Sequence, residues 1–90
     1  MPNPIHSLSY RIFRQMLAES RVSKGMLQQE VAEKLGKHQS YVSKYERGER
    51  RLDFTEFVTL ADVLAIDVAE FIELYRRNLL SAASGEGMLE

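Results

Sequence analysis

The 90-residue sequence has no cysteine and no long apolar run. The lack of cysteine excludes a disulfide framework and thiolate metal sites. Without a long apolar run, the chain has no segment that could cross a bilayer, and its first residues lack the apolar stretch of a secretory signal. We therefore expect a cytoplasmic protein without a membrane partner.

Catalytic groups are also scarce. The chain has two histidines, His6 and His38, which fall in different predicted elements. No nucleophile lies beside a base, no glycine-rich phosphate loop is present, and the carboxylates fall mostly at helix caps or on outer helix faces. The sequence therefore predicts neither an enzyme nor a metal site, and it implies no cofactor.

The net charge is small but unevenly distributed. The formal charge at pH 7 is −1. Residues 37–51 contain five Lys or Arg against two Glu, whereas residues 52–90 contain two Arg against eight Asp or Glu. Such a chain can present one basic and one acidic face, and a basic face favours a nucleic-acid partner. Chance clustering on a solvated surface explains the charges alone equally well.

Hydrophobic periodicity predicts an all-α fold. Apolar residues at three- and four-residue spacing indicate five helices, over residues 7–22, 28–35, 39–47, 54–64 and 68–76. Asp53 and Glu56 have the spacing of a capping box at the start of the fourth helix. The inward stripes of the last two helices are expected to include Phe54 and Ile72, respectively.

The same pattern sets the domain boundaries. Residues 1–6 are expected to form an N-terminal arm and residues 7–76 a five-helix domain. Residues 77–90 are expected to form a helix extension, which can include Leu79 and Leu80, and then a flexible tail. The tail is predicted because residues 81–87 are rich in Ser, Ala and Gly.

Residues 28–48 carry the clearest functional signal. Gly36 can adopt the left-handed conformation that a tight turn needs, and Ala32 is small enough for a second helix to approach closely. Val42 and Tyr45, three residues apart, give that second helix an inner face. Two short helices joined in this way form a helix-turn-helix, whose second helix enters the major groove of DNA.

The outer face of this second helix is polar. Gln39, Ser43 and Arg47 lie in one row at four-residue steps, and Ser40 and Lys44 lie in the next. Gln can pair with adenine, Lys can donate to guanine, and Ser can contact any base. A solvated face usually mixes charges of both signs, whereas no acidic side chain appears here before the helix ends. We therefore interpret the face as a DNA-reading surface.

Residues 25–48, followed by Glu49-Arg50-Arg51, closely resemble the phage-repressor/Cro-type helix-turn-helix family, also called the xenobiotic-response-element family. The match is densest in Q-x-x-V-A-x-x-L-G over residues 28–36 and in SYVSKYERG over residues 40–48. With the flanking helices it covers residues 11–75. The resemblance implies a lambda-repressor-like domain. It also implies a small transcriptional regulator, a repressor, that binds a double-stranded DNA operator sequence-specifically.

The resemblance also implies roles for single residues. It implies base-edge contacts for four residues of the recognition helix over residues 39–47, namely Gln39, Ser40, Ser43 and Lys44. It implies phosphate contacts for six residues, namely Gln28, Lys37, Tyr41, Arg47, Arg50 and Arg51. For Tyr41, packing at the edge of the two-helix interface is an equal alternative. Arg21 and Glu46 are expected to form an ion pair that ties the recognition helix to the first helix.

Two positions depart from the family pattern. Members commonly have Ser or Thr directly before each helix of the motif, where this chain has Leu27 and His38. Neither is a preferred N-cap, so we expect both helices to begin with poorly satisfied amides. A neutral ring nitrogen of His38 could accept a hydrogen bond, or the protonated ring could contact a phosphate. A partly exposed histidine without a special role is the alternative.

The last helix offers a surface for a second copy of the chain. One recognition helix reads only a few base pairs, so we expect a homodimer on a two-fold symmetric operator. Leu74, Leu79 and Leu80 are the expected dimer interface. Alternatively, Leu79 and Leu80 fold back onto their own domain or belong to the tail. A second functional hypothesis is an antitoxin that binds a protein partner as well as its own operator, since one fold can serve both roles.

Overall fold

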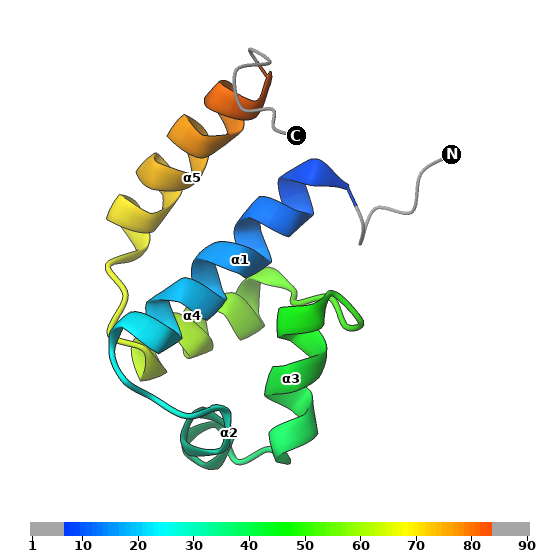
Figure 1. The fold of residues 1–90 in the computed structure, drawn as a ribbon. Helices are drawn as coiled ribbons and strands as arrows, with labels where there is room; N and C mark the ends of the chain where they lie inside the picture. The colour runs from blue at the N-terminus through cyan, green and yellow to red at the C-terminus, as the bar shows by residue number, and fades with distance from the viewer. Residues whose placement is uncertain (1–6, 84–90) are drawn as a thin grey trace.

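The computed structural model describes residues 7–83, so the predicted arm over residues 1–6 and tail residues 84–90 lie outside the described range. Across that range the protein is all-α, as predicted, with no strand. Its helices are α1 (Leu8–Ser23), α2 (Gln28–Leu35), α3 (Gln39–Arg47), α4 (Phe54–Val63) and α5 (Val68–Ala83). Figure 1 shows α1 and α5 side by side, with α2 and α3 at the other end of the molecule. No helix in this range combines the length and the apolar character needed to cross a bilayer.

The helix starts follow their sequence signals, with one exception. At α4, the Asp53 carboxylate accepts the Glu56 backbone N–H at 2.8 Å and the Glu56 carboxylate accepts the Asp53 N–H at 2.9 Å, which confirms the capping box. At α2, Leu27 supplies no side-chain acceptor, as expected, although Glu30 accepts the Leu27 N–H at 2.7 Å. The expectation of a poorly capped α3 is wrong, because Nδ1 of His38 accepts a first-turn backbone N–H at 3.1 Å.

One apolar core joins all five helices. Its fully buried large side chains are Leu17, Val31, Val42, Tyr45, Leu60 and Leu64. Two predicted inward residues are not in it: Phe54 is 70% exposed and Ile72 is 40% exposed. Both side chains border an open pocket between α1, α4 and α5, where no further helix among residues 7–83 covers them. Spacing along a helix gives the direction of a side chain, but burial also needs a neighbour on that side.

α5 is longer than the sequence suggested. It continues to Ala83, so residues 81–83 are helical although a flexible tail was predicted from Ser81. Leu and Ala are strong helix formers, which favours this extension through residues 79–83. Leu79, in the added part of the helix, is half-buried.

Two glycines make the sharp turns that frame α3. Gly36 has a φ of +69° and Gly48 has a φ of +79°, both in the left-handed region that a Cβ disfavours. A Cβ on Gly36 would meet no atom within 4 Å, whereas a Cβ on Gly48 would lie 2.7 Å from Nε of Arg14. Arg14 reaches this position because its Nη1 donates to the Glu46 backbone carbonyl at 2.7 Å. A side chain larger than that of glycine at this turn would therefore have to displace the Arg14 side chain.

Gly48→Ala should destabilise the fold more than Gly36→Ala. Both variants carry left-handed strain of about 1–2 kcal/mol, but only Gly48→Ala displaces Arg14 and its hydrogen bond, at a further cost of roughly 1 kcal/mol. Urea denaturation followed by circular dichroism measures both free energies of unfolding. In an Arg14→Ala background, the two glycine substitutions should lower the free energy of unfolding by equal amounts. Equal losses in the wild-type background would contradict the contact between Arg14 and the turn.

Candidate nucleic-acid interface

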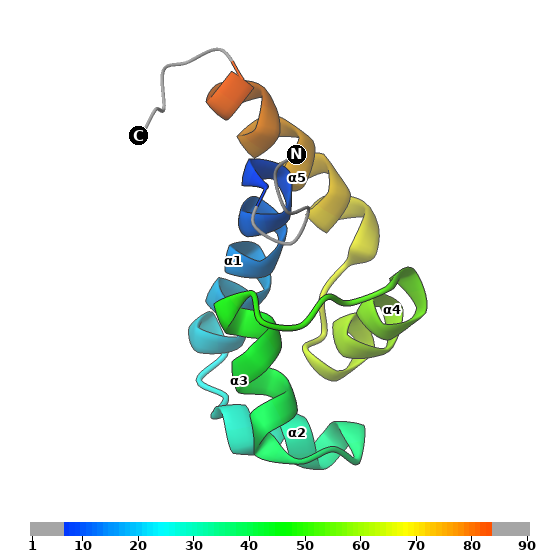
Figure 2. The same cartoon turned by 90° about the vertical axis from the view of Figure 1, so that its right-hand side faces the viewer.

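α3 packs on α1 and α2 through its inner face and leaves its outer face open. Val42 and Tyr45 are buried, whereas Gln39, Lys44 and Arg47 are exposed. Figure 2 shows α2 and α3 joined by a short turn, which is the predicted helix-turn-helix arrangement. The second helix of the motif is therefore free to enter a groove.

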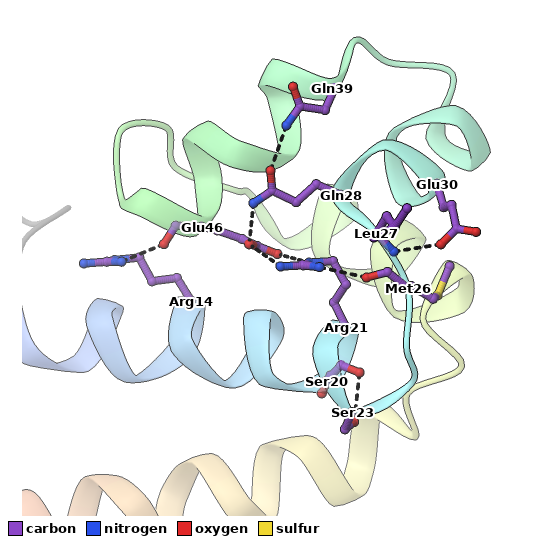
Figure 3. A network of polar contacts seen from close by, with 10 residues as sticks. All are labelled: Arg14, Ser20, Arg21, Ser23, Met26, Leu27, Gln28, Glu30, Gln39 and Glu46. Atoms are coloured by element: carbon purple, nitrogen blue, oxygen red, sulfur yellow. Dashed lines mark hydrogen bonds and ion pairs between the residues drawn. The ribbon is translucent and has the colours of Figure 1, made fainter.

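An ion pair joins α3 to α1 (Figure 3). Arg21 donates from Nε to one Glu46 oxygen at 2.7 Å and from Nη2 to the other at 3.1 Å, so the ion pair implied by the family resemblance is present and bidentate. The two side chains are only 14% and 8% exposed. Arg21 also donates to the Met26 carbonyl at 2.7 Å. The hydrogen bond from Arg21 to Glu46 raises the pKa of Arg21, which keeps the guanidinium charged.

The same carboxylate begins a chain of amide hydrogen bonds that leads to the outer face of α3 (Figure 3). Glu46 Oε1 accepts from Nε2 of Gln28 at 2.9 Å, and Oε1 of Gln28 accepts from Nε2 of Gln39 at 2.7 Å. An ionised carboxylate can only accept, so Gln28 must turn its NH₂ group toward Glu46 and its oxygen toward Gln39. Gln39 is thereby left with its amide oxygen and one N–H for a ligand.

Arg47 is held at the end of α3 by two neighbours. It donates from Nε and Nη2 to the Glu49 carboxylate at 3.1 and 3.0 Å, and from Nη1 to Oγ of Ser43 at 3.1 Å. The hydrogen bond from Arg47, then its charge and that of Lys44, lower the pKa of Glu49. Sequence reasoning gave Glu49 no role; its position two residues beyond Arg47 is the signal that could have found it.

Tyr41 is half-buried at the edge of α3. Its ring meets the Tyr45 ring edge-on at 5.9 Å between centroids, with the Arg50 guanidinium 4.6 Å and the Lys37 ammonium 5.4 Å from its centroid. Arg50 also donates to the Glu56 carboxylate at 2.9 and 3.2 Å, which lowers the pKa of Glu56. These contacts favour the packing interpretation of Tyr41, and they engage Arg50 within the protein.

The remaining predicted DNA contacts lie around the same helix. Oγ of Ser40 lies 3.0 Å from Nδ1 of His38 at the start of α3. Arg51 is exposed in the loop after α3, with its guanidinium 5.6 Å from the centroid of the Tyr10 ring. The six residues of α3 that are predicted to contact DNA thus lie near Gln28 and Lys37. Arg51 lies farther along the chain, against α1.

The predicted dimer residues differ in exposure. Leu74 is 45% exposed and Leu80 is 70% exposed, whereas Leu79 is half-buried. Leu79 lies four residues after the half-buried Tyr75 and so shares its face of α5, which makes it the least exposed of the three. Phe54 and Ile72, expected inside, add to the apolar surface instead.

Arg21→Ala should destabilise the fold by about 3 kcal/mol, because the shielded Glu46 carboxylate would lose its cation. For a domain of this size, that loss corresponds to a fall in Tm of roughly 12–24 °C. Thermal unfolding followed by circular dichroism measures it. Arg11→Ala is the matched control, since Arg11 is exposed on the same helix. An Arg21→Ala protein that melts within a degree or two of wild type would show that the pair carries little of the stability.

Comparison with solved structures supports the same architecture. The wild-type restriction-modification controller protein C.Esp1396I is similar to this chain at 24% identity, with a TM-score of 0.76 over 83% of this chain and 97% of that chain. A tyrosine-to-phenylalanine variant of that protein is similar at 23% identity, with a TM-score of 0.74 over 82% and 94% of the two chains. At this level of identity, the likeness shows a shared fold.

A family model adds the sequence relationship. The helix-turn-helix family model matches residues 17–71, which is more than half of the chain and includes α2, α3 and α4 in full. No curated protein matches the sequence. The family match spans the turn at Gly36 and the ion pair between Arg21 and Glu46. The chain belongs to the helix-turn-helix family.

Proposed function

We propose that this chain is a small transcriptional regulator that inserts α3 into the major groove of double-stranded DNA. Membership of the helix-turn-helix family supports DNA binding. The polar outer face of α3 supports sequence-specific reading, because Gln39, Ser43 and Lys44 offer donors and acceptors suited to base edges. We further propose that the regulator acts as a repressor, as its resemblance to the phage-repressor family implies.

The orientation of Gln39 is the observation that carries this proposal. Its amide donates to Gln28, whose own amide is fixed by Glu46. The free oxygen and N–H of Gln39 match the N6 donor and N7 acceptor that adenine presents in the major groove. A side chain that is ordered before binding loses less conformational entropy on contact. Gln39 is therefore the leading base contact, with Ser40, Ser43 and Lys44 beside it.

Cations and amides near α3 are the proposed phosphate contacts. Lys37 and Arg51 are exposed, and Gln28 retains one amide N–H beyond the one it gives to Glu46. Tyr41 and Arg50 lie against one another, and the Arg50 guanidinium is also paired with a carboxylate. Arg51 should therefore contribute more than Arg50 to the part of the affinity that depends on salt.

Gln39→Ala should relax the preference for one base in the operator, whereas Arg51→Ala should not. The lost bidentate contact should cost about 1–3 kcal/mol on the preferred duplex and leave binding to a scrambled duplex unchanged. Arg51→Ala should weaken both complexes alike and flatten the salt dependence by about one unit of log–log slope. Selection from a random duplex library gives the preferred sequence, and anisotropy titrations at several salt concentrations give the affinities.

Gln29→Ala is the matched control for this experiment. Gln29 is exposed on α2 and donates to Glu33 rather than to a residue of α3, so its loss should leave both affinities unchanged. If Gln39→Ala weakens both duplexes equally while Arg51→Ala changes the preferred base, the two assignments are reversed. A wild-type protein that selects no sequence would refute specific DNA recognition altogether.

We further propose that the regulator binds as a homodimer to a two-fold symmetric operator. Two recognition helices double the length of sequence that is read and fix its spacing at about 34 Å between adjacent major grooves. The exposed leucines of α5, Leu74 and Leu80, are the proposed interface, because apolar side chains left open on a helix are typical of a binding surface. α5 packs against α1 rather than α3, so an interface on it leaves α3 free.

Leu74→Glu should shift the protein from dimer to monomer at micromolar concentration, because a carboxylate would be buried against the partner copy. Sedimentation velocity measures the change. Leu8→Glu is the matched control: Leu8 on α1 is 46% exposed, close to the 45% of Leu74. A dimer that tolerates Leu74→Glu would place the interface elsewhere. A wild type that stays monomeric, alone and on DNA, would favour the antitoxin hypothesis, in which another protein covers these leucines.

A further inference from the structure

Arg47 has an unusually defined position for an exposed arginine. Its side chain is 56% exposed, yet three of its five N–H donors are used, two by Glu49 and one by Ser43. Ser43 lies one helical turn nearer the N-terminus of α3. The guanidinium therefore lies between Ser43 on the outer face of α3 and Glu49 just past the end of the helix.

The pairing also changes what Arg47 offers to DNA. The pKa of Glu49 is lowered by Arg47, so its carboxylate is ionised at neutral pH and neutralises the guanidinium beside it. A neutral pair attracts phosphate weakly, since non-specific affinity comes from uncompensated cations. An ion pair this exposed also adds little to stability. Neither phosphate binding nor folding accounts for the arrangement.

We propose that Glu49 is a positioning residue that holds Arg47 for reading a base edge in the major groove. This inference rests on the proposed DNA binding, and it replaces the backbone contact that the sequence implied for Arg47. Two N–H groups of Arg47 remain free, and arginine recognises guanine by donating two hydrogen bonds to its O6 and N7. Glu49 and Ser43 hold the guanidinium from two sides, so the orientation of its two free donors is set before DNA is bound.

The test compares Glu49→Gln with Glu73→Gln. Both changes remove one negative charge from an exposed side chain, but Glu73 lies on α5, away from α3. Affinities are measured on the selected duplex and on a scrambled duplex of equal length. Glu49→Gln should lower the ratio of the two affinities roughly 10-fold, because a bidentate base contact is lost. It should also steepen the salt dependence by about one log–log unit, because the released arginine becomes free to bind phosphate.

Arg47→Lys supplies a second readout. It keeps the positive charge but cannot form the bidentate contacts. Selection from the random duplex library is repeated with Arg47→Lys and with Glu49→Gln. Both variants should lose a preference for guanine at the same operator position. The double variant should lose no more of this preference than either single variant. Glu73→Gln should keep both the ratio and the preference.

Two outcomes would overturn the assignment of Glu49. One is a Glu49→Gln protein whose ratio of affinities for the selected and scrambled duplexes stays within twofold of the wild-type ratio. The other is a loss of preference at different positions in the Arg47 and Glu49 variants. Either outcome leaves DNA reading by Gln39 intact. A wild-type protein that does not distinguish the two duplexes would instead refute the proposed function, so the two failures are separable.

Discussion

The Glu46 carboxylate is the group on which the recognition surface depends. It lies on the inner side of α3, and its side chain is 8% exposed. A shielded charge is tolerated only when donors surround it, and the donors come from Arg21 of α1 and Gln28 of α2. The hydrogen bonds that satisfy this one charge therefore hold α1, α2 and α3 in place relative to one another. The orientation of Gln39 follows from the same charge, through the amide of Gln28.

Ion pairs between arginines and nearby glutamates are the second constraint on the recognition surface. Arg47 lies against Glu49, and Arg50 lies between Glu56 and the ring of Tyr41. The net positive charge of residues 37–51 therefore overstates the positive charge that is free to attract DNA. In our proposal, the paired arginines contribute mainly to geometry and the unpaired cations to attraction. This division is compatible with a chain whose net charge is −1.

The sequence by itself determined the features that depend on neighbours close along the chain. Helices were predictable because apolar residues recur at the helical period. The start of α4 was predictable because Asp53 and Glu56 meet within one turn. The turn at Gly36 was predictable because it needs a left-handed residue. The pair between Arg21 and Glu46 spans 25 positions and came from the family resemblance, which carries long-range information that spacing lacks.

Two kinds of feature were decided only by the tertiary structure. One is the burial of apolar residues at the edge of the core, and the other is the choice of partner for each long side chain. Phe54 and Ile72 keep the spacing of inward residues, but no helix among residues 7–83 covers them, whereas Leu79 on α5 is half-buried. Gln28 has several rotamers, and the nearby carboxylate selects the one that meets Gln39. Burial and rotamer choice depend on atoms brought together from distant parts of the chain. Local spacing fixes neither of them, because it specifies a direction and not what occupies the space in that direction.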